Sequence, residues 1–338
     1  MSVITKEVKE LTSKIDFSQL KNKSVLITGA SGLVGVYMVA CLKTVCEQYN
    51  IKIYTWFKSE IEPEFLDIFD SCKLIKSDIT DTSNFNDIPM VDCIIHAAGY
   101  GQPGKFLEDK IKTITLNTTS TINLFNKLNK GGKFLFISTS ELYSGLDSNN
   151  ILETEIGKTN TNHPRACYIE GKRCGEAICY SYLGQGVDVK IARLSLAYGP
   201  GTKKNDHRVL NSLIQKGLTE DSIRLMDGGD AMRTYCYITD VIEMFWNILL
   251  FGKQTIYNVG GRSVTTILDL ATLIGINLDK QVILPEKIEE MVGNPKVVNI
   301  DLSTYINEFK KNDFISLEDG IINTIKWQEK LYYDKNNV

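Results

Sequence analysis

Short apolar runs alternate with longer amphipathic stretches through the first half of the chain. The runs predict five buried strands, at Ser24–Thr28, Ile51–Phe57, Lys73–Ile75, Cys93–Ile95 and Lys133–Ser138. Apolar residues at helical spacing predict a helix from the first strand's turn to about Glu47 and a long helix over roughly Leu107–Asn129. This alternation predicts an α/β fold, a doubly wound parallel sheet with right-handed crossovers.

The alternation of strands and helices continues once more, with a predicted helix near Ala166–Tyr182 and a predicted strand at Asp188–Leu194. Beyond Gly199 the elements become shorter, and the segments GTKKND, DGGDAM and NVGGRS interrupt them. We expect these pieces to form a smaller C-terminal lobe over the carboxyl edge of the sheet, where such folds hold their ligands. The expected division is an N-terminal extension (1–22), a dinucleotide-binding domain (23–195) and a mainly substrate-binding lobe (196–338) interleaved with it.

Composition and charge exclude several classes of protein. A net charge of −3 without a basic cluster argues against nucleic-acid binding. The longest apolar run, Met244–Phe251, is too short to span a bilayer, and the first twenty residues lack the apolar core of a secretion signal. Eight scattered cysteines without a C-x-x-C pair, and three histidines without a shared spacing, predict neither disulfides nor a metal site. A cytoplasmic location is expected.

Three glycines follow the first predicted strand, at Gly29, Gly32 and Gly35. Between a strand and a helix, Gly29 would permit a tight turn, Gly32 would let a pyrophosphate approach the backbone, and Gly35 would allow close packing. The positive end of the helix dipole favours the bound anion. A flexible glycine-rich loop is the alternative, but the flanking strand and helix favour a dinucleotide site that also includes Ser31, Leu33 and Val34.

The segment YIEGK places Tyr168 and Lys172 four residues apart on a predicted helix. Positions i and i+4 share one helix face, so the phenol and the ammonium project together. A phenol is a poor base at neutral pH, but a nearby ammonium and an oxidised nicotinamide ring stabilise its phenolate. This pair therefore suits proton abstraction from a substrate hydroxyl, with hydride leaving the same carbon.

Polar residues stand where the fifth predicted strand ends. Thr139 would hydrogen-bond the reacting oxygen, although a simple turn-forming role is the alternative. Ser140 and Glu141 follow it. A carboxylate here is unnecessary for simple carbonyl reduction but suits chemistry at the carbon beside a newly formed ketone. The predicted catalytic set is therefore Thr139, Ser140, Glu141, Tyr168 and Lys172.

The glycine spacing, G-x-x-G-x-x-G, resembles that of the short-chain dehydrogenases, and the segments KSDI (76–79) and HAAG (96–99) strengthen the likeness. The resemblance implies that Asp78 and Ile79 contact adenine, that Ala97, Ala98 and Gly99 pass the cofactor ribose, and that Asn117 is structural. It also implies NAD as cofactor and a homodimer formed through a four-helix bundle. After the second strand, however, no carboxylate is present, and Lys58 could pair with the 2′-phosphate of NADP.

Length and motifs resemble the extended members of that family, which modify nucleotide sugars. Two segments, STSELY (138–143) and PRACYIEGKR (164–173), are most similar to segments of UDP-glucuronate decarboxylases. Two further decarboxylase segments resemble NDHRV (205–209) and RTYCYITD (233–240). The resemblance implies that Arg208 and Arg233 meet the diphosphate or sugar. Two segments depart from the decarboxylase pattern: Leu196 replaces an asparagine, and the loop over the sugar, which includes Tyr100, differs.

The leading hypothesis is a UDP-glucuronate decarboxylase that oxidises C4, loses carbon dioxide and reduces the ketone again. A GDP-mannose-type 4,6-dehydratase, a 4-epimerase and a 4-dehydrogenase are alternatives on the same scaffold. A catalytically silent NAD(P)-binding protein and a simple carbonyl reductase are less favoured, because Thr139, Tyr168 and Lys172 are all present and Glu141 suits a larger substrate.

Overall fold

The computed structural model describes residues 3–146, 150–204, 206–286 and 297–333. Within these residues a seven-stranded sheet forms the centre of the molecule, and every pairing in it is parallel. In spatial order its strands are β10 (Ile256–Val259), β6 (Asp188–Leu194), β5 (Leu128–Thr139), β4 (Val91–His96), β1 (Ser24–Thr28), β2 (Lys52–Phe57) and β3 (Cys72–Lys76). The predicted Rossmann-type α/β fold is therefore confirmed.

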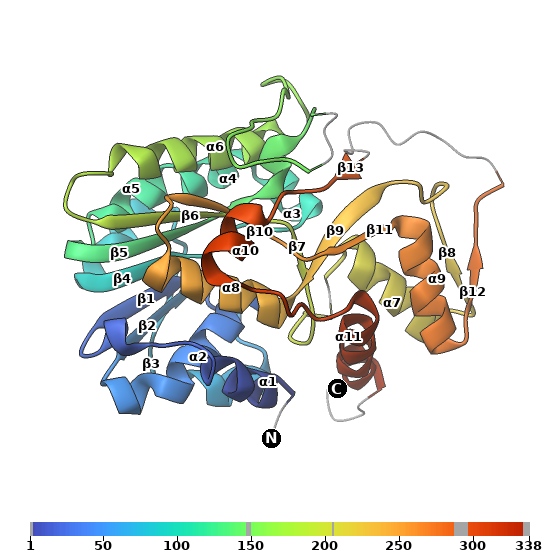
Figure 1. Cartoon of the computed structure of the whole chain (residues 1–338), viewed down its shortest axis with the longest axis horizontal. Helices are drawn as coiled ribbons and strands as arrows, with labels where there is room; N and C mark the ends of the chain where they lie inside the picture. Colours follow the sequence, from blue (N-terminus) through green and yellow to red (C-terminus); the bar gives the residue numbers. More distant parts are fainter. Residues whose placement is uncertain (1–2, 147–149, 205, 287–296, 334–338) are drawn as a thin grey trace.

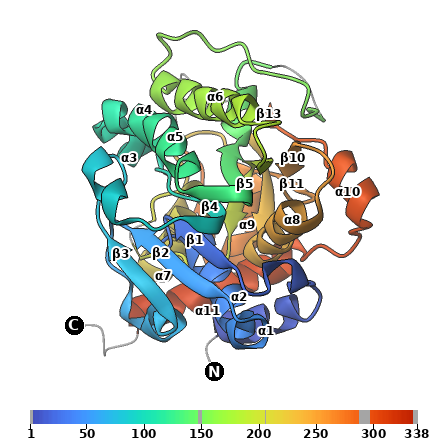
Figure 2. The ribbon, with the colours of Figure 1, turned by 90° about the vertical axis from the view of Figure 1, so that its left-hand side faces the viewer.

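Helices cover both faces of the sheet, as Figures 1 and 2 show. One face carries α4 (Lys110–Asn117), α5 (Thr119–Phe125) and α6 (Ala166–Ser181). The other carries α1 (Val3–Thr12), α2 (Leu33–Tyr49) and α8 (Ile238–Phe251). Strands that are buried on both faces read as continuous apolar runs, which is why they were visible in the sequence. The apolar run of the sequence analysis lies inside α8, where Met244 and Trp246 are fully buried.

The C-terminal lobe lies beside the carboxyl edge of the sheet (Figure 1). Its β9 (Met232–Tyr237) pairs with β7 (Leu196–Tyr198), β11 (Ser263–Thr266) and β13 (Val297–Val298), while β8 (Ser222–Arg224) pairs with β12 (Gln281–Ile283). The remaining helices are α3 (Pro103–Glu108), α7 (Val209–Thr219), α9 (Ile267–Leu278), α10 (Ser303–Phe309) and α11 (Leu317–Tyr333). Short 3-10 helices are η1 (Ser18–Leu20), η2 (Pro63–Phe69), η3 (Thr82–Asp87) and η4 (Ser140–Tyr143).

Both ends of the described chain pack onto the body of the molecule. Glu7 of α1 accepts hydrogen bonds from Tyr37 of α2 (2.7 Å) and from Tyr237 of β9 (2.5 Å). Trp327 of α11 stacks on Phe65 with 5.7 Å between ring centroids. The hydrogen bonds of Glu7 join α1 to α2 and to β9 of the C-terminal lobe. The ring contact joins α11 to η2. No helix of the described residues is long and apolar enough to cross a membrane.

The prediction of one long helix over 107–129 is wrong. The structure has α3, α4 and α5 in that region, and Leu128 already belongs to β5. The Asp109 side chain starts α4 by accepting from the Lys112 amide at 2.9 Å. The chain leaves helical geometry at Thr118, in a run of hydroxyl residues whose side chains bond nearby carbonyls, such as Thr121 to Asn117 at 2.8 Å. Such side-chain hydrogen bonds compete with the backbone hydrogen bonds of the helix. The spacing of apolar residues gives no sign of this competition.

Candidate active site

A cavity of about 430 Å³ opens at the carboxyl ends of the central strands. It gathers most of the residues singled out from the sequence, although they come from separate loops and from α6. Those in its wall are Gly29, Ser31, Gly32, Leu33, Val34, Gly35, Asp78, Ile79, Ala97, Ala98, Gly99, Tyr100, Thr139, Ser140, Glu141, Tyr168, Lys172 and Arg208. Asn117 and Arg233 do not line it, and Asn205 lies outside the described residues.

The glycine turn brings the backbones of β1, β4 and α2 closer than any side chain would permit. Gly29 has φ +68°, and a Cβ there would lie 2.7 Å from the Ala97 oxygen and the Ala98 nitrogen. A Cβ on Gly35 would overlap the Gly29 carbonyl and lie 2.6 Å from Ala30 Cα. Gly32 is the N-cap of α2, so bare backbone faces the cavity at the start of the helix. This cradle fits the pyrophosphate of a dinucleotide.

Lys172 is 4% exposed and is held at the end of β5. Its Nζ donates to the Ile137 carbonyl at 2.6 Å and lies 4.8 Å above the centre of the Phe136 ring. Burial lowers the pKa of the Lys172 ammonium to about 8, and the charge of Glu176, one turn along α6, opposes this shift. The amine is thus fixed in the cavity wall on the same helix as Tyr168.

Tyr168 points its phenol at Thr139, whose hydroxyl is its hydrogen-bond partner. Burial raises the pKa of Tyr168 to about 12, the Glu141 charge adds to the rise, and the Thr139 hydrogen bond opposes it. Thr139 in turn accepts from the Glu141 amide at 3.2 Å, which fixes its orientation at the strand end. Thr139, Tyr168 and Lys172 all line the cavity.

Glu141 faces two arginines. Its Oε1 lies 3.3 Å from an Arg165 guanidinium nitrogen, and the charge of Arg233 on β9 also acts on it. Its Oε2 is buried, and among the described residues no group hydrogen-bonds it. Burial raises the pKa of the Glu141 carboxyl, and the charges of Arg165 and Arg233 oppose the rise. A buried carboxylate with one unpartnered oxygen beside Tyr168 is placed for proton transfer to a bound molecule.

Arg208 is held by Asp206 at the lobe side of the cavity. The guanidinium donates to both Asp206 oxygens, with Nε 3.0 Å from each, and Nη1 donates to the Ala197 carbonyl at 3.3 Å. Burial would raise the pKa of the Asp206 carboxyl, but the charge and hydrogen bonds of Arg208 bring it below its usual value. Asp206 thus fixes the direction in which Arg208 meets a ligand.

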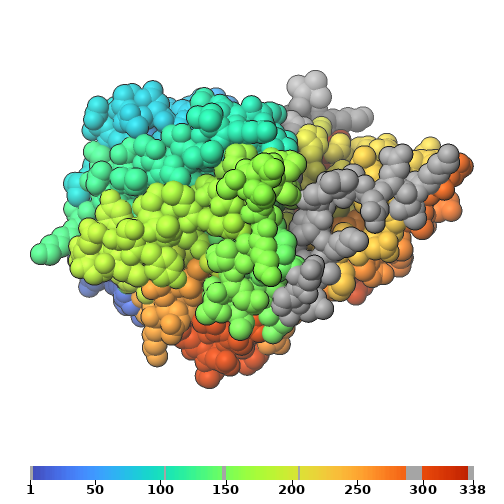
Figure 3. Space-filling view, turned by 90° about the horizontal axis from the view of Figure 1, so that it is seen from above, coloured from blue at the N-terminus to red at the C-terminus, as the bar shows by residue number. Residues whose placement is uncertain are grey.

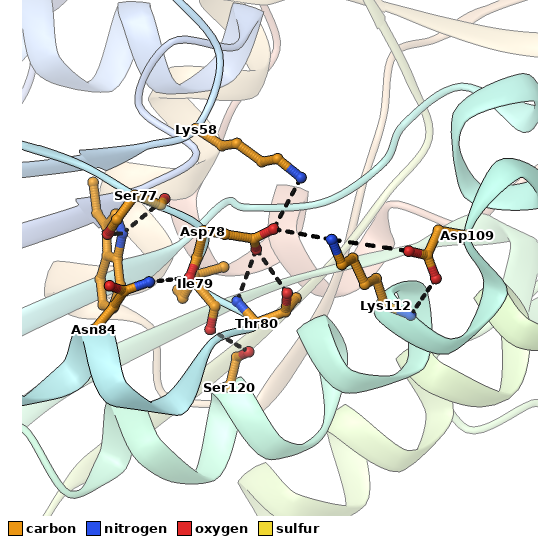
Figure 4. Close-up of polar contacts among 10 residues, drawn as sticks. Lys58, Ser77, Asp78, Ile79, Thr80, Asn84, Asp109, Lys112 and Ser120 are labelled. Carbon is orange, nitrogen blue, oxygen red and sulfur yellow. Dashed lines mark hydrogen bonds and ion pairs between the residues drawn. The ribbon is translucent and has the colours of Figure 1, made fainter.

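Asp78, which lines the cavity, is the centre of a charged cluster (Figure 4). Its Oδ1 accepts from the Thr80 amide at 3.0 Å and from the Thr80 hydroxyl at 2.7 Å. Its Oδ2 lies 2.9 Å from Lys58 Nζ and 3.4 Å from Lys112 Nζ. Although partial burial opposes it, these donors hold the pKa of the Asp78 carboxyl well below its usual range.

Two of the predicted residues, Asn117 and Arg233, are outside the cavity wall. Asn117, 1% exposed, donates to the Thr113 carbonyl at 2.8 Å within α4. A Cβ on Gly175 would lie 2.8 Å from the Asn117 carbonyl, so α4 and α6 are in very close contact there. Arg233 acts on Glu141 from β9.

Sequence reasoning missed Arg165, Asp206 and Phe106 as parts of the site. In the sequence, Arg165 is part of the PRACYIEGKR segment, three residues before Tyr168, but nothing there assigned it a role. Phe106 belongs to α3 and stacks on the Tyr168 ring with 4.7 Å between centroids and 6° between planes. No local pattern marks a buried phenylalanine as the partner of a residue 62 positions later, since the contact exists only in the fold.

Phe106→Leu should lower turnover by roughly fivefold, because stacking worth about 1 kcal/mol no longer orients the Tyr168 ring. Steady-state kinetics and a dinucleotide titration measure the effect. Phe125→Leu is the matched control, since Phe125 stacks on Tyr182 at 3.9 Å outside the cavity wall. We expect that control to lose stability but not turnover. Equal losses of turnover in both variants would mean that Phe106 acts only through stability.

A sequence model of the NAD dependent epimerase/dehydratase family matches residues 25–260. The chain belongs to this family, so the predicted family is confirmed. Among curated relatives, UDP-glucuronic acid decarboxylase 1 of Danio rerio is 30% identical over 261 residues, covering 76% of this chain and 61% of its own length. UDP-glucuronic acid decarboxylase 6 of Arabidopsis thaliana is 28% identical over 287 residues, 81% of this chain and 78% of its own length.

Solved structures share the fold at lower sequence identity. The dTDP-glucose 4,6-dehydratase of Streptomyces venezuelae, solved with NAD, has a TM-score of 0.79 and 19% identity, covering 92% of this chain and 99% of its own. The UDP-glucose 4-epimerase of Thermotoga maritima has a TM-score of 0.78 and 19% identity, covering 91% of this chain and 99% of its own. This chain spans about 61% of the length of the fish decarboxylase.

Proposed function

We propose that the chain is a nucleotide-sugar enzyme that oxidises C4 of the sugar with NAD, and that its reaction is the decarboxylation of UDP-glucuronate. The observation that carries this proposal is the position of Glu141, beside Tyr168 and facing two arginines. The relatives named UDP-glucuronic acid decarboxylase support the choice of reaction.

The cofactor would be held by the glycine turn at its pyrophosphate, by Asp78 and Ile79 at its adenine, and by the segment 97–99 at its ribose. NAD bound there would supply the hydride acceptor for C4 oxidation and the hydride donor for the final reduction, so the reaction would have no net oxidation. Tyr168 takes the proton of the C4 hydroxyl, helped by the Lys172 ammonium, while Thr139 orients the oxygen. These assignments rest on the convergence of the three side chains in one cavity.

Oxidation at C4 turns a glucuronate into a β-keto acid. The C5–C6 bond then breaks, carbon dioxide leaves, and the electron pair moves to the C4 oxygen. C5 must next receive a proton, for which Glu141 and Ser140 are the available groups on the cavity wall. Arg165 and Arg233 make this group net positive whether or not Glu141 carries a proton, which suits a substrate with a carboxylate at C6. Arg208, oriented by Asp206, would meet the diphosphate.

The first test is mass spectrometry of UDP-glucuronate after incubation with the protein and NAD. A product lighter by one carbon dioxide supports the proposal. A 4,6-dehydratase is the second candidate, because Leu196, in place of the decarboxylases' asparagine, lines the cavity. Two results together would contradict decarboxylation: UDP-glucuronate stays unchanged, and UDP-glucose or GDP-mannose loses water. The proposed reaction would then be dehydration, and the proposed oxidation at C4 would be kept.

Glu141→Gln should permit C4 oxidation but slow product formation by about 10²-fold or more, because the amide cannot deliver a proton to C5. The expected result is accumulation of reduced cofactor in a single turnover, followed by slow release of product. Glu170→Gln is the control, since Glu170 pairs with Arg173 on the same helix and does not line the cavity. Unchanged product formation by Glu141→Gln would remove Glu141 from the mechanism.

We also propose a homodimer formed through the face of α4, α5 and α6, which Figure 3 shows as one continuous surface. This face exposes apolar side chains, with Ile111 73% exposed and Ile114, Ile122, Tyr180 and Leu183 more than a third exposed. Ile111→Glu should convert a dimer into a monomer in light scattering. Ile276→Glu, at a position 74% exposed on α9, is the control. A monomer before any substitution would overturn this assembly.

A further inference from the structure

Two buried residues of α6 bind consecutive residues of β5, directly before Thr139. Lys172 donates to the Ile137 carbonyl at 2.6 Å. Glu176, one turn further along α6, accepts from the Ser138 hydroxyl at 2.6 Å. The helix is therefore joined to the strand end at two adjacent positions, and these two hydrogen bonds limit how α6 can shift along β5.

Arg193 of β6 binds the Glu176 carboxylate through two hydrogen bonds. Its Nε donates to Oε1 at 2.9 Å, and its Nη2 donates to Oε2 at 2.7 Å. Arg193 is buried and stands opposite Ser138 in the pairing of β5 with β6. A bidentate pair of this kind fixes direction as well as distance. Both Glu176 oxygens are thus held by buried donors, which come from two neighbouring strands.

The same guanidinium also binds the 3-10 helix η4, which carries Glu141. Its Nη1 lies 2.9 Å from the hydroxyl of Tyr143, the last residue of η4. Nη1 also donates to the carbonyls of Glu153, at 3.0 Å, and Glu155, at 3.1 Å. A shift of the Arg193 side chain would therefore move the short helix that places Glu141 in the cavity wall.

Glu176 also supplies a negative charge that acts on the Lys172 ammonium. Burial lowers the pKa of Lys172 to about 8, and the charge of Glu176 opposes this fall. In the described chain, Cys179 of α6 and His96 of β4 act on Lys172 as well. Burial raises the pKa of the Cys179 thiol and lowers the pKa of His96 to about 3, so both are uncharged near neutral pH. Arg193 is charged, and Glu176 neutralises it.

We propose that Glu176, held by Arg193, is a positioning residue for the reaction. It fixes the strand end that carries Thr139 against α6, and it keeps a compensating charge near the Lys172 ammonium. Glu176 does not line the cavity, so it acts through these neighbours and not on the substrate. This inference rests on the proposed function, because it relies on the roles proposed there for Thr139 and Lys172.

Glu176→Gln should slow hydride transfer near neutral pH by about 10- to 10²-fold, the cost of displacing reacting groups by up to about 1 Å. The amide cannot accept from both donors of Arg193, so the strand end and η4 lose their common anchor. Single-turnover formation of reduced cofactor from UDP-glucuronate and NAD measures the loss. Titration with 5′-AMP should give an unchanged affinity, because the glycine turn lies on β1 and α2.

Asp240→Asn is the matched control. Asp240 and Lys311 form an equally buried pair, with side chains 6% and 2% exposed, against 6% and 4% for Glu176 and Arg193. Asp240 does not line the cavity. We expect the control to lose stability but to keep its rate of hydride transfer. Full hydride transfer in Glu176→Gln, or the same loss in both variants, would overturn the positioning role and leave the proposed function in place.

The pH dependence of stability tests the charge of Glu176 without any substrate. A lysine whose pKa is lowered by folding destabilises the fold below that pKa, and stability is regained as pH rises towards its unfolded pKa of about 10.4. For Lys172 this gain begins near pH 8 in the unchanged chain. It should begin at a lower pH in Glu176→Gln, where the charge of Arg193 is unopposed.

The stability lost in Glu176→Gln should therefore shrink as pH rises from about 7 to about 9, in denaturant unfolding of the full chain. A loss of hydrogen bonds alone gives a difference that does not change with pH, and that result would overturn the effect of Glu176 on Lys172. If the unchanged chain transfers no hydride from any nucleotide sugar, the proposed function fails, and this unfolding series still decides whether Glu176 acts on Lys172.

A second variant serves if Glu176→Gln does not fold. Removing one charge of a buried pair is costly, whereas removing both is far less so. We therefore expect Glu176→Gln combined with Arg193→Met to fold, to lose hydride transfer and to show the same dependence of stability on pH. Hydride transfer at the rate of the unchanged chain in this double variant would overturn the proposal.

Discussion

Replacing Tyr168 by phenylalanine should reduce hydride transfer by about 10²- to 10⁴-fold, the contribution of a positioned general base. The variant loses the hydroxyl that bonds Thr139 but keeps the ring that stacks on Phe106. Lys172 keeps its own anchor at the Ile137 carbonyl, so the cavity wall should retain its shape. Single-turnover formation of reduced cofactor measures the loss, and a cofactor titration should give an unchanged affinity within error.

Tyr180→Phe is the matched control for this experiment. Tyr180 lies on the same helix, three turns further on, is 44% exposed and does not line the cavity. This substitution also removes one phenol hydroxyl from α6, and we expect full turnover. Hydride transfer by Tyr168→Phe at the rate of the unchanged chain would exclude Tyr168 as the base.

Gly35→Ala should lower the free energy of unfolding by about 3 kcal/mol, the upper part of the range for overpacking, and weaken dinucleotide binding at least about tenfold. The added Cβ would overlap the Gly29 carbonyl and lie 2.6 Å from Ala30 Cα. Both obstacles are backbone atoms, which cannot rotate away as a side chain can. Relief requires α2 to move from β1, and that movement opens the turn that cradles the pyrophosphate.

Denaturant unfolding and a cofactor titration test this prediction together. Gly104→Ala is the control, because a Cβ there meets nothing within 4 Å and the residue lies in α3. Alanine in a helix is favoured over glycine, so this control should be neutral or slightly stabilising. Wild-type stability and affinity in Gly35→Ala would mean that the close approach of α2 to β1 is not needed.

The parts of this protein that were predictable are those whose signal is local. Buried parallel strands read as short apolar runs, and the strand predicted at Asp188–Leu194 has those bounds in the structure. Glycines spaced between a strand and a helix marked the turn, because the constraint at Gly29 and Gly35 is one of backbone geometry. Tyr168 and Lys172 stood out because helical spacing alone puts them on one face.

Other features needed the whole fold. β10 joins the sheet beside β6, although about 60 residues separate the two strands. The break at Thr118 depends on hydroxyl side chains and on the tight contact of α6 at Gly175, neither of which alters apolar periodicity.

The sequence by itself determined the fold class, the glycine turn and the placing of Tyr168 and Lys172 on one helix, since neighbours along the chain specify them. Only the tertiary structure decided which charges meet. The contacts of Glu141 with Arg165, Arg208 with Asp206, and Lys58 with Asp78 join separate loops or depend on how one loop folds back. Their energies depend on burial and distance, and three-dimensional packing sets both.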